Sequence, residues 1–189
     1  RAVFDLREVQ AYGGTVSGEF VMNNRNGLSV GGKIFAQSIA VQPLLADAAG
    51  ITRLTGRGDA EVSFLGSGSS VHAIMNALSG KGAVKLGKGM IDGLDLNTLM
   101  GNGKGSGGTT VFDSLGATFT IKDGNLRNDD LLFALPNYEA RGKGRIGLGA
   151  QDLDYVFTPA ALRANEGKGL AIPVRITGPW ADPKIRPDL

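Results

Sequence analysis

The stretch from Leu115 to Thr158, LGATFTIKDGNLRNDDLLFALPNYEARGKGRIGLGAQDLDYVFT, decides the fold class, because apolar and polar residues alternate along it in short successive runs. Successive side chains of a β-strand point to opposite faces, so each run predicts a strand with one apolar face. Asp123-Gly124 and Pro136-Asn137 separate runs and suit tight reversals. The stretch therefore predicts consecutive antiparallel strands whose apolar faces point the same way.

The loops predict how these strands pair. A two-residue loop at Pro136-Asn137 places Leu131 opposite Gly142, so that a large side chain covers the backbone of a bare glycine. In the following hairpin, a loop over residues 149–152 places Ile146 opposite Tyr155.

The first hairpin of the stretch needs an irregular step. A two-residue turn at Asp123-Gly124 would place Phe133 on the wrong face of the sheet. One extra residue in a strand restores the phase, so we expect a β-bulge near residues 128–130.

The composition bounds the class of protein. The chain has 189 residues, of which 42% are hydrophobic, with 30 glycines and only 6% aromatic residues. Glycine in strands marks bulges and sharp bends, so we expect a strongly curved sheet. The net charge of +2 does not indicate a nucleic-acid partner, and the absence of cysteine excludes a disulfide framework. No run approaches the roughly 20 apolar residues of a membrane helix.

The rest of the chain predicts further strands and a few short helices. Pro43 suits a first helical turn, Gly50 a helix end and Ser70 an N-cap. Pro173 interrupts the last alternating run and indicates a sheet edge. The predicted strands are Ala2–Gln10, Thr15–Met22, Leu28–Phe35, Arg53–Leu65, Gly82–Lys88 and Leu170–Ile176, and the predicted helical segments are Ser38–Ala49, Val71–Leu78, Leu94–Met100 and Thr110–Leu115.

No set of residues in the sequence indicates catalysis, a metal or a cofactor. His72 is the only histidine, and no Gly-x-Ser-x-Gly nucleophile motif is present. The glycine-rich residues 101–105 lack the Ser or Thr that follows the lysine of a phosphate-binding loop. Asp152 and Asp154 are too few ligands for a calcium loop and more simply pair with the basic residues of the preceding strand. We therefore expect a protein that is not an enzyme.

The apolar face of the strands is the remaining candidate site. Each buried methylene contributes about 0.8 kcal/mol, so an open apolar face suits acyl chains. Short helices lying on the face would instead close it as an ordinary core, and the sequence leaves both alternatives open. The candidate lipid-binding residues are Phe119, Ile121, Leu131, Phe133, Leu135, Tyr138, Ile146, Leu148, Tyr155 and Phe157.

Five segments, taken in order, carry a family resemblance. They are Ala77–Gly82 (ALSGKG), Asp92–Leu96 (DGLDL), Phe112–Gly124 (FDSLGATFTIKDG), Gly142–Leu148 (GKGRIGL) and Ile172–Lys184 (IPVRITGPWADPK). Together they resemble the C-terminal region of the AsmA-like proteins of Gram-negative bacteria. The resemblance covers about residues 50–189 well and the first fifty residues more loosely.

The resemblance implies one β domain over residues 1–189, cut from a longer periplasmic protein that is anchored to the inner membrane through parts missing here. Proteins of this kind are tied to outer-membrane assembly and lipid homeostasis, and larger relatives are thought to carry phospholipids along β-sheet grooves. The family has no catalytic residues to carry over.

Residues and resemblance together predict a mainly β fold: a curved, twisted antiparallel sheet, shaped as a groove or half-barrel, with a few short α-helices. The predicted function is non-enzymatic binding or conduction of phospholipid acyl chains in the cell envelope. The alternative is a scaffold module with a closed core that binds envelope proteins.

Overall fold

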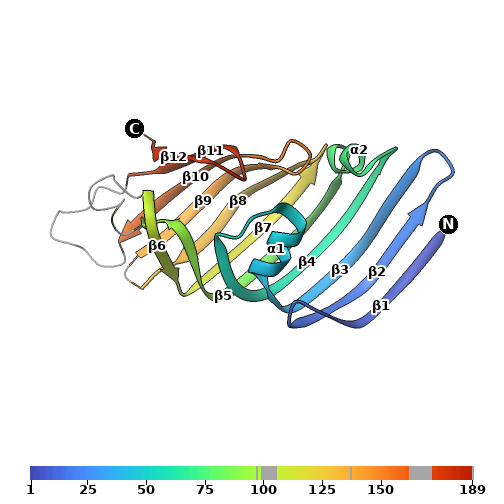
Figure 1. Ribbon diagram of the computed structural model, residues 1–189, viewed down its shortest axis with the longest axis horizontal. Helices are drawn as coiled ribbons and strands as arrows, with labels where there is room; N and C mark the ends of the chain where they lie inside the picture. The colour runs from blue at the N-terminus through green and yellow to red at the C-terminus, as the bar shows by residue number, and fades with distance from the viewer. Residues whose placement is uncertain (97, 99–105, 137, 162–171, 189) are drawn as a thin grey trace.

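The computed structural model describes residues 1–96, 98, 106–136, 138–161 and 172–188, and in these it forms twelve strands and two helices (Figure 1). In chain order the elements are β1 (Ala2–Ala11), β2 (Gly14–Asn23), β3 (Leu28–Ala40), α1 (Val41–Ala49), β4 (Leu54–Gly68), α2 (Val71–Asn76), β5 (Ser79–Leu94), β6 (Ser106–Phe112), β7 (Ser114–Lys122), β8 (Asn125–Ala134), β9 (Tyr138–Gly147), β10 (Asp152–Ala161), β11 (Val174–Pro179) and β12 (Lys184–Pro187).

All twelve strands belong to one antiparallel sheet. The strand order is β1-β2-β3-β4-β5-β7-β8-β9-β10-β11-β12, and β6 pairs with β5 beside this path. Nearly every strand therefore pairs with its neighbour in sequence, as expected of a meander. The turn between β7 and β8 shows why: Asp123 (φ 50°) and Gly124 (φ 76°) both adopt the positive φ that a two-residue hairpin turn requires.

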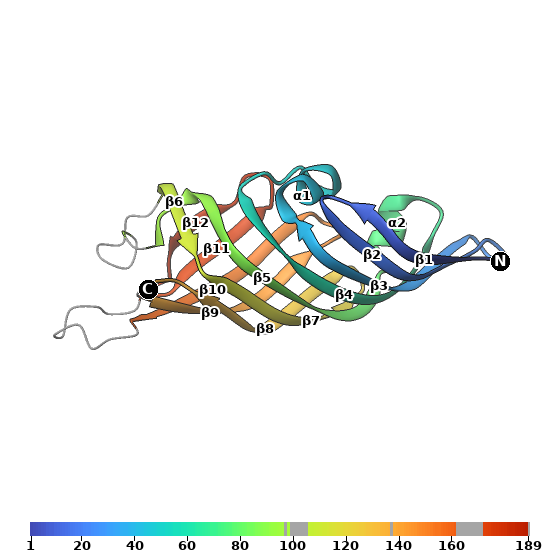
Figure 2. The same cartoon turned by 90° about the horizontal axis from the view of Figure 1, so that it is seen from below.

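The sheet is a trough whose length runs across the strands, because the strands themselves bend (Figure 2). Helix α1 lies on the concave side of this trough, and α2 lies at the opposite ends of the strands (Figures 1 and 2). The described strands do not close into a ring. The predicted fold class, a curved open antiparallel sheet with short helices, is confirmed.

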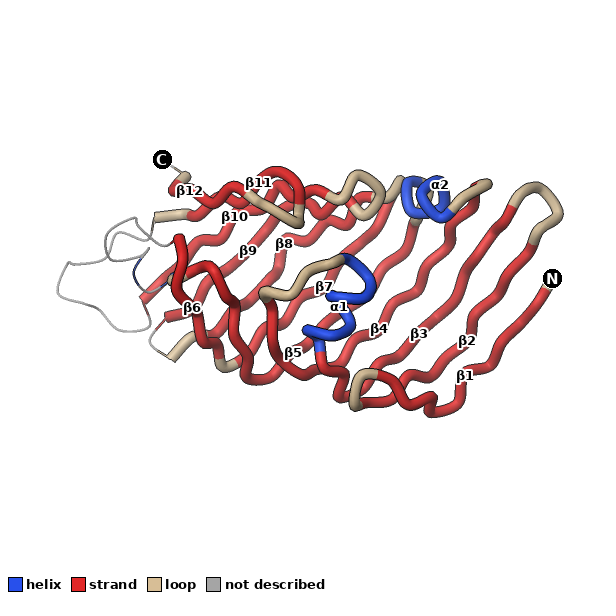
Figure 3. The backbone as a smooth tube through the Cα atoms, viewed as in Figure 1, coloured by secondary structure: helices blue, strands red, loops and turns tan. Residues whose placement is uncertain are grey.

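Both helices follow from local sequence signals (Figure 3). In α1, Pro43 lies in the first turn and Gly50 ends the helix in the left-handed conformation at φ 68°. In α2, Ser70 is the N-cap, and its side-chain oxygen accepts a hydrogen bond of 3.1 Å from the backbone N–H of Ala73.

One end of the concave face is closed by the sheet itself. β5 pairs with β7 up to Leu86 and with β6 from Gly89 onward, so its last residues leave the main path of the sheet. Phe112 of β6 packs on Phe133 of β8, with ring centroids 4.8 Å apart. The buried cluster at this end comprises Leu86, Leu94, Leu96, Phe112, Phe133, Leu135, Ala140 and Val174.

Thr110 ties β6 to the end of β5. Its side chain is fully buried, donates a hydrogen bond to the carbonyl oxygen of Leu94 and accepts one of 3.0 Å from the backbone N–H of Leu96. Because this buried hydroxyl both donates and accepts a hydrogen bond, it holds β6 in place and leaves no polar atom unpaired.

Most predicted elements and one predicted register are confirmed. The first three strands, α1 and α2 lie where the sequence places them. Leu131 faces Gly142, and the register of β8 shifts between Asn128 and Leu131, as expected of a bulge there.

Three predictions are wrong. Residues 110–115 form no helix, because they belong to β6 and β7. Ile146 faces Leu153 rather than Tyr155, since the loop between β9 and β10 starts one residue earlier and covers residues 148–151. The edge strand is β12, not the strand after Pro173, which pairs on both sides. Of the predicted helix over 94–100, Leu94 belongs to β5, and residues 97, 99 and 100 lie outside the described residues.

We predict that Phe133→Ala lowers the free energy of unfolding by about 3–5 kcal/mol, because the Phe133 ring is only 1% exposed and its loss leaves a cavity against Phe112. Leu132→Ala is the matched control, since Leu132 is 39% exposed and should cost about 0.5 kcal/mol or less. Urea denaturation of both variants measures the difference. Equal losses would contradict a closed core at this end.

Candidate functional site

The strand registers align a row of side chains on the concave face, which we call the concave row. The pairings place its members opposite one another from β1 to β10. The row contains apolar residues and glycine alone: Phe4, Phe20, Gly32, Phe64, Gly80, Ile121, Leu126, Ile146 and Leu153.

Three aromatic rings of the concave row stand side by side near the β1 edge. The ring centroids of Phe4 and Phe20 are 6.3 Å apart, and those of Phe20 and Phe64 are 6.2 Å apart. Phe20 and Phe64 come into contact because Gly32, on the strand between them, has no side chain. The three rings form a continuous aromatic surface across four strands.

Bare glycines recur beneath large side chains along the trough. Phe119 lies over Gly82, where an added Cβ would be 2.6 Å from the ring. Leu131 and Tyr155 converge over Gly142, where an added Cβ would be 2.6 Å from each. The concave face thus gains part of its apolar lining from large side chains packed directly on glycine backbone.

The concave face is open toward β1 and closed toward β12. Phe4 is 49% exposed, and Phe20, Phe64 and Phe119 are partly exposed. Toward β12 the end of β5 and β6 lie over the same face, where Phe133, Leu135 and Val174 are buried, while Ile146 and Leu153 of the concave row stay partly exposed. The accessible part of the concave face is therefore the half formed by β1 to β7, outside the stretch of β3 and β4 against which α1 packs.

The ten predicted lipid-binding residues divide between buried and accessible positions. Ile121, Leu131, Phe133, Leu135 and Tyr155 are buried, while Phe119, Tyr138, Ile146, Leu148 and Phe157 are partly exposed. Leu135 and Leu148 lie in the connections after β8 and after β9, outside the strands.

Sequence reasoning missed Phe4, Phe20 and Phe64 as site residues. Phe4 and Phe20 lie on predicted strands, in phase with their apolar neighbours. To place them beside Phe64, one must know the register between β3 and β4. These two strands are joined through α1, so no short loop fixes their register. The sequence feature that could have indicated this aromatic surface is Gly31-Gly32 in β3. Glycine has no side chain, so rings from the two neighbouring strands can meet above it.

Tyr155 joins the trough to the bulge of β8. Its hydroxyl donates a hydrogen bond to Oδ1 of Asn128, and its ring centroid lies 5.0 Å from that of Phe157. Burial, with a smaller contribution from the charge of Asp130, raises the pKa of the Tyr155 hydroxyl, which therefore stays neutral. The one polar atom of this side chain is satisfied beneath the apolar surface.

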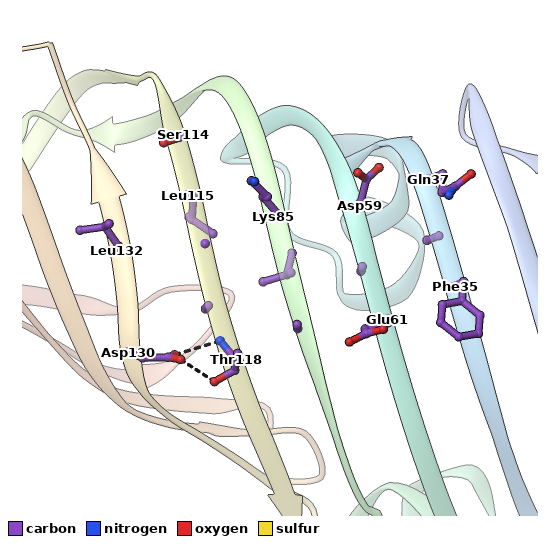
Figure 4. Close-up of a pocket in the computed structure, with 16 residues that line it drawn as sticks. Phe35, Gln37, Asp59, Glu61, Lys85, Ser114, Leu115, Thr118, Asp130 and Leu132 are labelled. Atoms are coloured by element: carbon purple, nitrogen blue, oxygen red, sulfur yellow. Dashed lines mark hydrogen bonds between the residues drawn. The ribbon is translucent and has the colours of Figure 1, made fainter.

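The outer face of the same strands carries a second hollow, lined by both apolar and charged side chains (Figure 4). Phe35, Glu61 and Thr118 lie on it, because they alternate with concave residues along β3, β4 and β7. The carboxylate of Asp130 accepts hydrogen bonds from the backbone N–H of Thr118 at 2.9 Å and from its hydroxyl at 2.5 Å. These bonds hold the pKa of Asp130 below its usual value.

The predicted pairing of Asp152 and Asp154 with basic residues of β9 is confirmed for Asp152 alone, since Asp154 pairs with Arg175 of β11 and Arg141 lies 3.6 Å from Glu139 of its own strand. Arg145 donates two parallel hydrogen bonds of 2.9 Å to the carboxylate of Asp152. Arg175 pairs with Asp154 at 2.8 Å. The bidentate pair lowers the pKa of Asp152, chiefly through its hydrogen bonds.

His72 lies on α2, where its Nε2 is 3.0 Å from Nδ2 of Asn76. Among the residues the structure describes, no group of three or more His, Cys, Asp or Glu side chains could hold a metal ion. In the same part of the chain, no helix is long and apolar enough to cross a membrane.

Comparison with known proteins identifies a family. The model of the AsmA family matches residues 1–131 of the chain. The match includes the first fifty residues, where the sequence motifs are loosest, and ends before the motifs of residues 142–184. Neither a curated protein nor a solved structure matches the chain.

We predict that Gly82→Ala lowers the free energy of unfolding by about 1–3 kcal/mol, because the new methyl group would collide with the Phe119 ring and the carbonyl oxygen of Glu61. Gly116→Ala, one strand away, meets no atom closer than 4.0 Å and should leave stability unchanged or raise it by up to about 1 kcal/mol. Chemical denaturation measures both. Equal destabilisation would contradict the close approach at Gly82.

We also predict acid sensitivity from Asp152. Its pKa is lower in the folded chain than the value of about 3.9 in an unfolded chain, so its stabilising effect is present above that value and is lost as pH falls through the folded pKa. Asp152→Asn should therefore lose less stability than the parent between neutral pH and pH about 3. Urea midpoints at both pH values test this, and identical losses would contradict it.

Proposed function

Because the chain belongs to the AsmA family, whose members are associated with the cell envelope, we propose that it is a non-enzymatic envelope protein that binds the acyl chains of phospholipids along its concave face. We propose further that it acts in outer-membrane biogenesis and lipid homeostasis. Its location would be the periplasm, with an anchor in the inner membrane supplied by other parts of the parent protein.

The observation that carries the proposal is the accessible aromatic surface of Phe4, Phe20 and Phe64. An acyl chain offers methylene groups and no hydrogen-bonding atoms, and the concave row places only apolar side chains and glycine opposite it. Each methylene removed from water contributes about 0.8 kcal/mol, so a chain spanning several strands gains several kcal/mol.

The closed half of the trough limits where the ligand lies. Phe133 and Leu135 belong to the buried cluster, so they support the sheet rather than contact a ligand. The contact surface that remains is formed by β1 to β7, and its candidates are Phe4, Phe20, Ile34, Val62, Phe64 and Phe119.

The alternative, a scaffold module that binds envelope proteins, is favoured by a different observation. The outer hollow combines exposed apolar side chains, Phe35 and Leu132, with the charges of Glu61 and Lys85. Mixed apolar and charged surfaces of this kind suit protein partners. The two functions use opposite faces of the sheet, so variants on one face separate them.

We predict that the chain purified from a Gram-negative host carries phospholipid and that Phe64→Asp reduces the bound amount at least tenfold, equivalent to about 1.4 kcal/mol. A carboxylate in the aromatic surface would have to be desolvated beside the acyl chain. Native mass spectrometry and lipid extraction measure the bound lipid, and circular dichroism checks that the variant is folded.

Leu65→Asp is the matched control. Leu65 is the next residue along β4, lies on the outer face and is 60% exposed, so its replacement should leave the bound lipid unchanged. Absence of lipid from the parent chain, or equal losses in the two variants, would contradict acyl-chain binding on the concave face.

A further inference from the structure

Helix α1 lies on the concave face of the trough, yet none of its residues is buried (Figures 1 and 2). It packs on β4 and β3, and four of its partly exposed residues, Gln42, Leu45, Ala46 and Ala49, recur at the spacing of one helix face. Leu45 is the one large apolar side chain among these four. The shorter α2, by contrast, buries Ile74 against β4. A segment with so few buried apolar contacts opens at a low cost in free energy.

Both ends of the segment that contains α1 are fixed to the sheet. Val41 and Leu54 pack against the buried cluster at the closed end. The backbone N–H of Asp92 in β5 also donates a hydrogen bond of 2.9 Å to the carbonyl oxygen of Arg53. Any movement of α1 is therefore confined to residues 42–52, which we call the flap.

The flap is one unit, and one side-chain hydrogen bond ties it to the rest of the described chain. Nε2 of Gln42 donates a hydrogen bond of 2.8 Å to the carbonyl oxygen of Thr52, which joins the start of α1 to the loop after it. Gly50 reverses the chain between them at φ 68°. The tie is the hydrogen bond of 2.7 Å that the hydroxyl of Tyr12 donates to Oδ2 of Asp47. A single exposed hydrogen bond contributes little, so the flap is held mainly by its weak apolar face.

An apolar path along β3 and β4 leads from the aromatic surface to the flap. After Phe64, the concave pairs of these two strands are Ile34 with Val62 and Ala36 with Ala60. β3 then continues into α1, which folds back over the same face (Figure 1). An acyl chain that follows this path from the aromatic surface therefore meets the flap.

We propose that the flap lifts to admit an acyl chain and closes over it, with Leu45 against the chain. This inference rests on the acyl-chain binding proposed above and adds a moving part to it. Closure removes Leu45 and the methylene groups of the ligand from water together, so the ligand supplies the apolar contacts that α1 lacks. Because the ligand makes these contacts only when the flap is closed, its binding shifts the flap toward the closed state.

Amide hydrogen exchange of the whole chain tests the flap, with palmitoyl lysophosphatidylcholine below its micelle concentration as the probe. Without lipid, the amides of residues 45–51 should exchange faster than those of β4. With lipid, their exchange should slow by about tenfold or more, because the closed state is then favoured. The amides of α2, which is already held by Ile74 and by its Ser70 cap, should change little.

Leu45→Ser should lower the amount of bound lysophosphatidylcholine by about threefold or more and reduce the slowing of exchange, because serine offers the chain little apolar contact. Leu44→Ser is the matched control and should leave both unchanged, since Leu44 lies on the opposite side of the helix from Ala46. Circular dichroism checks that both variants are folded. Lipid binding without slower exchange in the flap, or equal effects of the two variants, would overturn the flap and leave acyl-chain binding standing. A chain that binds no lipid would overturn both.

Discussion

The close contact between large apolar side chains and bare glycine backbone is the constraint on which the trough depends. Phe119 lies over Gly82, and Leu131 and Tyr155 share the space above Gly142. A Cβ at either glycine would push the covering side chain away from the sheet. The apolar side chains then could not pack directly on the backbone of the neighbouring strand.

The same sheet serves as a hydrophobic core at one end and as an accessible surface at the other. The difference comes from the end of β5 and from β6, which cover Phe133 and leave Phe64 partly exposed. The side chain of Thr110 in β6 forms hydrogen bonds to the backbone of Leu94 and Leu96. These bonds hold β6 in place over the buried end of the sheet. Burial and solvent accessibility are thus divided between different strands of one continuous sheet.

Most strands and both helices were predictable because their signals are local: period-two alternation, Pro43 and Gly50 around α1, and the Ser70 cap of α2. The bulge near Asn128 was predictable because a two-residue turn at Asp123-Gly124 leaves the strand out of phase. The β9–β10 register was missed because several glycine-rich loop positions keep the apolar residues on one face equally well.

The candidate site was predicted less completely, for a physical reason. Alternation shows that Phe133 and Phe64 each lie on an apolar face, but it does not show which of them is covered. Coverage depends on β6, whose glycine- and threonine-rich sequence, SGGTTVF, has a weak strand signal. The accessible aromatic surface also depends on the register between β3 and β4, which cannot be predicted from a local sequence pattern.

The meander connectivity has a consequence for how such a sheet can change over evolutionary time. Because nearly every strand pairs with its immediate neighbours in the chain, a hairpin can be gained or lost between two others while the remaining contacts persist. The length of the trough is then a modular quantity, adjusted in units of two strands, whereas its cross-section is fixed by the curvature of each strand.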